Sequence, residues 1–243
     1  MMRTLIKKKV KETEELSSWI EHLEELRNRL IISILSWLIA SGVSLYFSPG
    51  IVRFLAKIAE KSLVFTSPAE PLLTYIKLSL ITGIFLSAPV WCFELWQFIS
   101  PALVKEEKDI LLLFLPFIPI LFILGMVFGL VVLLPAGVKF LLAFSNDFLQ
   151  PMLSVGNYIS FALNLIIGCG IVFELPVLIL ITGKIGLISL VSLKRYRKLA
   201  ILSAFIISAI ITPTVDAFTQ IALALPLILL FELSILLLKI FKF

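Results

Sequence analysis

Long apolar runs alternate along the chain with short segments that carry most of its charges. Leu, Ile, Val and Phe dominate the runs, and most of them approach the ~20 residues that a helix needs to cross a bilayer core. The fifth run is shorter, ~20 Å long as a helix against a hydrocarbon core of ~30 Å. The six runs cover residues 30–47, 74–98, 110–134, 159–181, 199–211 and 217–238. They predict an all-α, polytopic integral membrane protein with six transmembrane helices.

The residues ahead of the first run divide into a basic arm and the start of a helix. Residues 1–17 carry five Lys and Arg side chains and have no apolar period, so we expect a basic N-terminal arm near the lipid headgroups. Ser18 and Glu21 have the spacing of a capping box, which predicts that a helix starts at Ser18. Residues 18–243 are expected to form a single six-helix transmembrane domain.

Prolines and glycines predict where the helices end, bend and pack. Ser48-Pro49-Gly50 is expected to end the first span, and residues 135–158 to form a loop that contains a short helix. Pro116 and Pro119 lie inside the third run, where a missing backbone N–H favours a kink. Gly125 and Gly129 have small-xxx-small spacing, which lets another helix approach closely.

The composition supports a membrane protein and excludes several other classes. The chain is 60% apolar and 15% charged, with a mean hydropathy of +1.11 and a net charge of +5. In a membrane protein such a charge reflects loop topology, so we expect no nucleic-acid partner. With a single histidine and two distant cysteines, no metal site or cofactor is expected. The chain lacks zinc-protease, nucleophile-elbow and phosphate-loop motifs, and we expect no enzyme.

The distribution of basic residues predicts the orientation in the membrane. Placing both termini, the loop after the second span and the loop after the fourth span in the cytoplasm gives that side 16 of the 21 Lys and Arg residues. Cytoplasmic loops of membrane proteins carry such an excess. We therefore expect a multi-pass protein of the cytoplasmic membrane with both termini in the cytoplasm.

Acidic residues gather on the same cytoplasmic side, where basic residues usually dominate. Glu24 and Glu25 precede the first span, and Glu106 and Glu107 lie between the second and third spans. Such a cluster suggests a cationic ligand, and arginine is the cation that carboxylates bind best, through paired hydrogen bonds. The alternative is a set of surface ion pairs between these acids and the basic residues near them, Arg27, Arg29, Lys105 and Lys108.

Glu174 is an ionisable residue inside the fourth run. A charged side chain there costs ~2.5 to 3.5 kcal/mol on insertion scales, so it should face a cavity or a polar partner. One possibility is a bond to Asn164 or Gln220 that joins helices. Another is a different function for the chain, a proton-coupled transporter of small solutes that uses Glu174. No inverted repeat with matched broken helices supports that alternative.

Several motifs, in this order, resemble those of the TatC family, the multi-span subunit of the twin-arginine protein translocase. The resemblance extends from about residue 16 to residue 238. The loop after Leu103 departs from the family's pattern, because Val104, Glu106 and Asp109 make it more acidic. The motifs are His22-Leu-Glu-Glu-Leu-Arg-Asn-Arg-Leu30, Ser67-Pro-Ala-Glu-Pro71, Leu95-Trp-Gln-Phe-Ile-Ser-Pro-Ala-Leu103, Phe173-Glu-Leu-Pro176 and Thr212-Pro-Thr-Val-Asp-Ala-Phe-Thr-Gln220.

The resemblance implies a glove-shaped protein of the inner membrane that binds the Arg-Arg signal peptides of folded export substrates at its cytoplasmic face. It also implies single-span TatA/TatB-type partner subunits, further copies of the same chain and the surrounding lipid bilayer as partners. Matched by position, the family's signal-binding residues correspond to Glu25, Glu107, Arg27 and Phe98, to which the acidic neighbours Glu24 and Glu106 are added. The polar positions within and at the end of the spans correspond to Glu174, Gln220 and Asp216.

Overall fold

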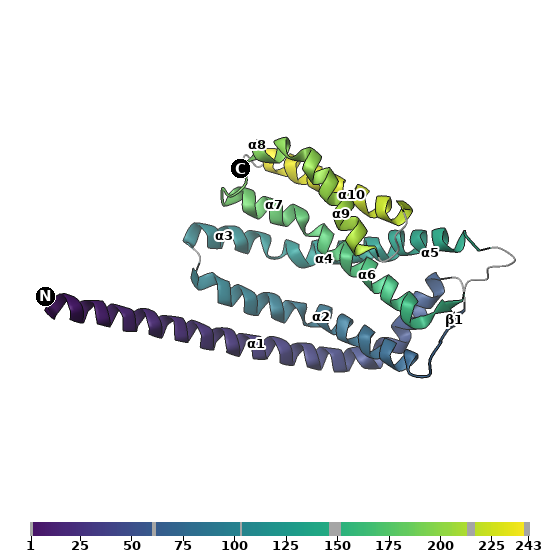
Figure 1. Ribbon diagram of the computed structural model, residues 1–243, viewed down its shortest axis with the longest axis horizontal. Helices are drawn as coiled ribbons and strands as arrows, with labels where there is room; N and C mark the ends of the chain where they lie inside the picture. The colour runs from purple at the N-terminus through teal and green to yellow at the C-terminus, as the bar shows by residue number, and fades with distance from the viewer. Residues whose placement is uncertain (1, 60–61, 103, 146–151, 213–216, 241–243) are drawn as a thin grey trace. The chain divides into compact units, whose positions relative to one another are not determined.

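The computed structural model describes residues 2–59, 62–102, 104–145, 152–212 and 217–240, and nearly all of them are helical (Figure 1). The all-α prediction is confirmed. The helices are α1 Met2–Ile58, α2 Glu70–Ile99, η1 Ser100–Ala102, α3 Lys105–Phe114, α4 Phe117–Phe128, η2 Gly129–Leu133, α5 Leu134–Leu142, α6 Val155–Phe173, α7 Leu175–Lys184, α8 Leu190–Arg195, α9 Arg197–Ile211 and α10 Ala217–Ile240.

Five helical stretches in the described part of the chain are long and apolar enough to cross a membrane. Their order matches that of the predicted runs, and the remaining run, the fifth, is helix α9 with 15 residues. A helix of that length spans only ~22 Å, so it is too short by length alone to be counted as a span. The five stretches are His22–Ile58, Glu70–Phe98, Leu111–Leu142, Val155–Lys184 and Ala217–Ile240.

The chain divides into two compact units, Met1–Ser48 with Ile76–Leu103 and Pro49–Tyr75 with Val104–Phe243. In the first unit α1 and α2 run antiparallel, side by side (Figure 1). The indole N–H of Trp37 donates to the Leu80 carbonyl over 2.9 Å, and the hydroxyls of Ser44 and Thr82 share a hydrogen bond. A Cβ atom on Gly83 would lie only 2.7 Å from the Ser41 Cα atom, so the glycine allows the two helices to touch.

Helix α1 is longer than predicted at both ends. It begins at Met2 and continues through Pro49 to Ile58, so the predicted start at Ser18 and the predicted end at Ser48-Pro49-Gly50 are both wrong. Residues 2–17 are rich in Lys, Glu and Leu, which favour helix and make a new start at Ser18 unnecessary. Pro49 cannot donate to the Leu45 carbonyl, but the Ser48 hydroxyl donates to it over 2.8 Å.

Glycines bring the central helices of the second unit together. A Cβ atom on Gly125 would lie 2.8 Å from the Cβ atom of Phe173 in α6. One on Gly129 would lie 3.1 Å from the Sγ atom of Cys169. Cys169 is fully buried there. The predicted small-residue packing face is therefore confirmed, and the α6 backbone packs directly against α4 and η2.

The helices of this unit break at or next to prolines. Pro116 lies between α3 and α4, so the kink predicted there is confirmed. The kink predicted at Pro119 is wrong, because Pro119 lies in the first turn of α4, where a helix tolerates proline. Glu174 separates α6 from α7, with Pro176 in the first turn of α7. Pro135 lies in the first turn of α5, and the apolar helix therefore continues to Leu142. The loop predicted to begin at residue 135 begins later, after that helix.

A short parallel strand pair, not foreseen from the sequence, joins two connections of the second unit. Strand β1, Leu63–Val64, pairs with β2, Leu153–Ser154. Close to this pair, the Glu70 carboxylate accepts hydrogen bonds from the Gly156 N–H over 2.8 Å and from the Thr66 N–H over 2.6 Å. The start of α2 is thereby tied to the start of α6.

Candidate functional site

A hollow of about 440 Å³ lies between α1 and α2 in the first unit. We call it the α1–α2 hollow. Residues of α1 that recur with helical spacing form one wall, and two residues one turn apart on α2 form the other. Its lining residues are Glu24, Glu25, Asn28, Arg29, Ile32, Glu94 and Gln97.

Arg29 lies at the centre of the α1–α2 hollow and is hydrogen-bonded on both sides. Its Nε atom donates to Glu25 Oε1 over 3.1 Å, and its Nη2 atom donates to the same oxygen. Its Nη1 atom donates to Glu94 Oε2 over 3.3 Å and also to Gln97 Oε1. The Arg29 side chain is only 18% exposed, and that of Glu94 11%. The two walls of the hollow therefore hold the guanidinium group of Arg29 between them.

The charges in the α1–α2 hollow do not balance. Glu24, Glu25 and Glu94 supply three carboxylates against the one guanidinium of Arg29. Glu24 is exposed, and Glu25 is partly exposed. The excess of negative charge, together with a surface open to water, suits the hollow to a further cation.

Phe98 lies beside the α1–α2 hollow through a contact with His22. The two rings stack with centroids 4.5 Å apart and an angle of 13° between their planes. The His22 Nδ1 atom lies 3.7 Å from Glu25 Oε2. The predicted residues Glu25 and Phe98 are thus brought together through His22. Arg27 is exposed and is not among the residues that line the hollow.

The other acidic residues predicted for the site belong to the second unit. Glu106 and Glu107 lie in the first turn of α3, and their side chains are outside the described part of the structure. Asp216 also lies outside the described residues. The roles assigned to these three residues therefore stay predictions.

Glu174 lies at the break between α6 and α7, next to a second hollow. Its Oε1 atom is buried and has no hydrogen-bond partner among the described residues. The neighbouring Phe173, Pro176 and Val177 help to line an apolar hollow of about 580 Å³, the α7–α10 hollow. The other walls come from residues of α3 and α4 and from Leu230, Leu233 and Leu237 of α10.

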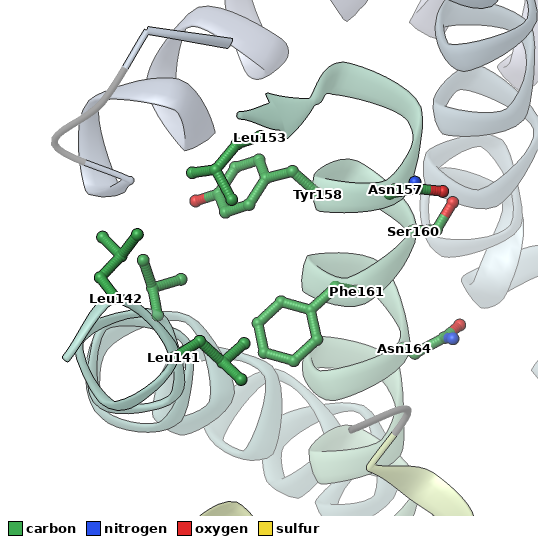
Figure 2. Close-up of a pocket in the computed structure, with 9 residues that line it drawn as sticks. Leu141, Leu142, Leu153, Asn157, Tyr158, Ser160, Phe161 and Asn164 are labelled. Carbon is green, nitrogen blue, oxygen red and sulfur yellow. The ribbon is translucent and has the colours of Figure 1, made fainter. Parts of the chain in front are cut away.

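Within the described part of the chain, neither Asn164 nor Gln220, the partners that the sequence suggested, bonds to the Glu174 Oε1 atom. Gln220 donates from Nε2 to the Phe205 carbonyl of α9 over 3.1 Å, which ties α10 to α9 instead. Asn164 lines a different hollow of about 400 Å³, between α5 and α6. Figure 2 shows the rings of Tyr158 and Phe161 on the side of α6 that faces Leu141, while Asn164 projects from another side.

Sequence reasoning missed five of the seven residues that line the α1–α2 hollow. They include Arg29, whose guanidinium is bonded on both sides, and Glu94 and Gln97, which form the second wall. Glu94 and Gln97 are three residues apart at the end of the second span, which places them on one face of a helix. An acid and an amide on one helix face, near the membrane surface, were the signal in the sequence that could have indicated this wall.

Comparison with known proteins supplies the family. The model of the Sec-independent protein translocase protein (TatC) family matches residues 21–226. The chain belongs to the TatC family. It is 43% identical to the TatC protein of Aquifex aeolicus over 227 residues, covering 90% of this chain and 94% of that one. It is 40% identical to the TatC protein of Helicobacter pylori strain J99 over 218 residues, covering 90% and 87%.

Solved TatC structures have the same fold. A crystal structure of the twin-arginine translocase receptor TatC in DDM superposes with a TM-score of 0.77 at 42% identity. The match covers 89% of this chain and 98% of that one. The chain is therefore a multi-pass membrane component of the twin-arginine translocase. TatC membership favours this role over the small-solute transporter considered as an alternative.

Proposed function

We propose that this TatC chain is the receptor of the translocase and that it binds the Arg-Arg signal peptides of folded proteins at the cytoplasmic face. The observation that carries the proposal is the binding of the Arg29 guanidinium by Glu25, Glu94 and Gln97. A site that already holds one guanidinium, and still has unbalanced carboxylates, has the chemistry that an arginine pair requires.

The signal peptide would compete with Arg29 for the Glu25 carboxylate. One arginine of the peptide takes the place of Arg29 on Glu25, and Arg29 keeps its bonds to Glu94 and Gln97 of α2. Glu24, exposed at the rim, is available to the second arginine. Each hydrogen bond that is broken is replaced by an equivalent one, so the exchange itself changes the free energy little. The excess of negative charge then favours the incoming peptide.

This arrangement discriminates against lysine. Two nitrogen atoms of the planar Arg29 group, Nε and Nη2, donate to Glu25, and a peptide arginine in its place would make the same two bonds. A guanidinium presents its donors in a fixed fork, whereas an ammonium group is a compact point charge without that fork. A peptide with Lys-Lys should therefore bind more weakly.

The remaining residues have proposed roles around this exchange. Glu107 and Glu106 supply further carboxylates for the arginine pair, Arg27 faces the neighbouring part of the peptide, and the ring of Phe98 contacts it.

The protein lies in the inner membrane with both termini in the cytoplasm, as the bias of Lys and Arg toward these loops supports.

Assembly with other subunits is proposed to use the polar residues of the second unit. The unpartnered Oε1 atom of Glu174, beside the apolar α7–α10 hollow, suits a polar group on a single-span TatA/TatB-type helix. Gln220, near the start of α10, and Asp216, which precedes that helix in the sequence, would contact a partner subunit or a further copy of the chain.

Binding of a labelled Arg-Arg peptide to the detergent-purified chain, across a salt series, tests the receptor role. We expect a clear preference over the Lys-Lys peptide that is lost in Glu25→Gln with Glu107→Gln. Glu232→Gln removes one carboxylate of the second unit and is the control. Equal binding of both peptides to the native chain would count against the proposal.

A further inference from the structure

A cationic hollow lies on the second unit, and its lining includes none of the residues proposed to bind the signal peptide. It has a volume of about 390 Å³ and is formed where α8, α9 and α10 meet. Three of its residues are basic and one is acidic. Its lining residues are Lys194, Arg197, Glu232, Ile235, Leu236 and Lys239.

Only part of the positive charge in the cationic hollow is neutralised. Arg197 donates from Nη2 to Glu232 Oε2 over 2.7 Å, and the two side chains are 47% and 43% exposed. Lys194 and Lys239 are exposed and have no ion-pair partner among the described residues. The hollow therefore has two uncompensated positive charges, and Arg197 has further N–H groups for an anion.

The cations are held by helices that pack on a common apolar core. Leu193, next to Lys194, is 8% exposed and belongs to a buried cluster with Ile235 and Leu238 of α10. Lys239 follows Leu238 directly. Helix α8 is fixed at its start by the Ser189 hydroxyl, which accepts from the Ser192 N–H over 3.1 Å. The positions of Lys194 and Lys239 are thus set by packed elements.

The start of α9 adds donors to the same place. Arg197 is its first residue, and its N-cap residue, Tyr196, makes no side-chain cap to the first turn. The first N–H groups of a helix are left unpaired by the helix itself and favour an anion. An anion bound at Arg197 would lie at this helix start.

The surroundings of the cationic hollow indicate what kind of anion fits. Glu232, Leu236 and Lys239 recur along one face of α10, a helix that is apolar enough to cross the membrane. Beside Glu232, Leu229, Leu233 and Leu236 recur with helical spacing and are 68%, 45% and 52% exposed. A cationic end above an exposed apolar face matches a lipid, whose headgroup is charged and whose chains are apolar. Basic pockets between membrane helices bind anionic headgroups in this way.

We propose that the cationic hollow binds the phosphate of an anionic phospholipid in the adjacent leaflet, with Lys194, Arg197 and Lys239 as its ligands. The acyl chains lie along Leu236 and the apolar face of α10. The lipid bridges α8, α9 and α10, and thereby supports α9, which is too short to span the bilayer alone. This site is independent of signal-peptide binding.

Native mass spectrometry of the full chain in detergent, titrated with dioleoyl phosphatidylglycerol or dioleoyl phosphatidylcholine, tests the proposal. We expect phosphatidylglycerol to remain bound at several-fold lower concentration than phosphatidylcholine. Lys194→Gln with Lys239→Gln should weaken phosphatidylglycerol binding several-fold. Arg195→Gln with Lys198→Gln removes the same charge from exposed neighbours that do not line the hollow, and should leave binding unchanged.

Two further measurements make the test specific for the cationic hollow. Glu232→Gln releases Arg197 from its ion pair and should strengthen phosphatidylglycerol binding. Inorganic phosphate, added in excess, should not displace the lipid, because it lacks the acyl chains. Equal weakening in the two double variants would overturn the site in favour of diffuse surface charge. Displacement by inorganic phosphate, or equal affinity for the two lipids, would also overturn it.

Discussion

Glu70 and Ser154, 84 positions apart in the chain, are joined by a hydrogen bond from the serine hydroxyl to the carboxylate. The same oxygen accepts the Gly156 N–H, and the other oxygen accepts both the N–H and the hydroxyl of Thr66. All four donors are uncharged. A single carboxylate therefore accepts hydrogen bonds both from the loop before α2 and from the start of α6. The Ser-Pro-Ala-Glu-Pro motif therefore has a structural explanation.

The Glu70 bonds predict a stability effect separate from peptide binding. Glu70→Ala leaves the Gly156 and Thr66 N–H groups without their acceptor, and unpaired backbone donors are costly. We expect the melting temperature of the detergent-purified protein to fall by several degrees. Glu24→Ala, at an exposed carboxylate without these bonds, is the control and should melt like the native chain. Identical melting of the two variants would show that the bonds contribute nothing.

The all-α membrane fold was predictable because hydropathy depends on composition over many residues. The apolar runs, the Pro116 break and the Gly125 and Gly129 packing face all follow from local patterns that the fold did not override. The ends of the helices were harder to predict from the sequence. Ser48 bonds the carbonyl that Pro49 leaves free, so a motif that usually ends a helix lies inside α1.

The candidate site was only half predictable. Glu25 was found because an acid on the basic side of the membrane is unusual. Glu94 and Gln97 were missed because they join Arg29 across 65 and 68 positions, a relationship that no local spacing reports. The pairing of Glu25 with Arg29, four residues apart, was foreseen as an ordinary surface ion pair, and only the second helix makes it the centre of a hollow.

Removal of the internal arginine should improve binding of an Arg-Arg peptide. In Arg29→Gln, Glu25 loses the guanidinium that competes with the peptide, and the α1–α2 hollow becomes more negative. We expect several-fold tighter binding in a fluorescence titration at low salt. Arg29→Lys keeps the charge but not the fork, and should fall between the two. Weaker binding by Arg29→Gln would mean that Arg29 shapes the site and does not compete for it.

Charge reversal at Glu107 should abolish recognition without affecting membrane insertion. Glu107→Lys places a cation beside the proposed position of the arginine pair, and like charges repel. We expect the variant to be found in the membrane at native levels and to bind no Arg-Arg peptide. Lys108→Glu tests the same turn of α3 with the opposite change. Native-like binding by Glu107→Lys would remove this residue from the site.

The contact between α1 and α2 predicts a steric effect at Gly83. A Cβ atom there would overlap the Ser41 backbone, whereas one at Gly42 would meet nothing within 4 Å. Gly83→Leu should destabilise the helix pair by ~1 to 3 kcal/mol, as overpacking does. It should also weaken peptide binding, because the α1–α2 hollow needs both helices. Gly42→Leu is the matched control, and denaturant unfolding in detergent measures both. Equal effects of the two variants would contradict the close contact.

Glu174 should matter for assembly more than for docking. Its buried Oε1 atom has no hydrogen-bond partner among the described residues, and buried polar atoms are rarely left unpaired. A polar group of a second subunit, packed on the α7–α10 hollow, would supply the missing bond. Glu174→Ala should therefore retain native affinity for the Arg-Arg peptide but lose copurification with single-span subunits, whereas Glu174→Gln should keep part of it. If Glu174→Ala lost peptide docking and copurification to the same extent, the carboxyl would act in docking itself, and the division of roles between the two hollows would be wrong.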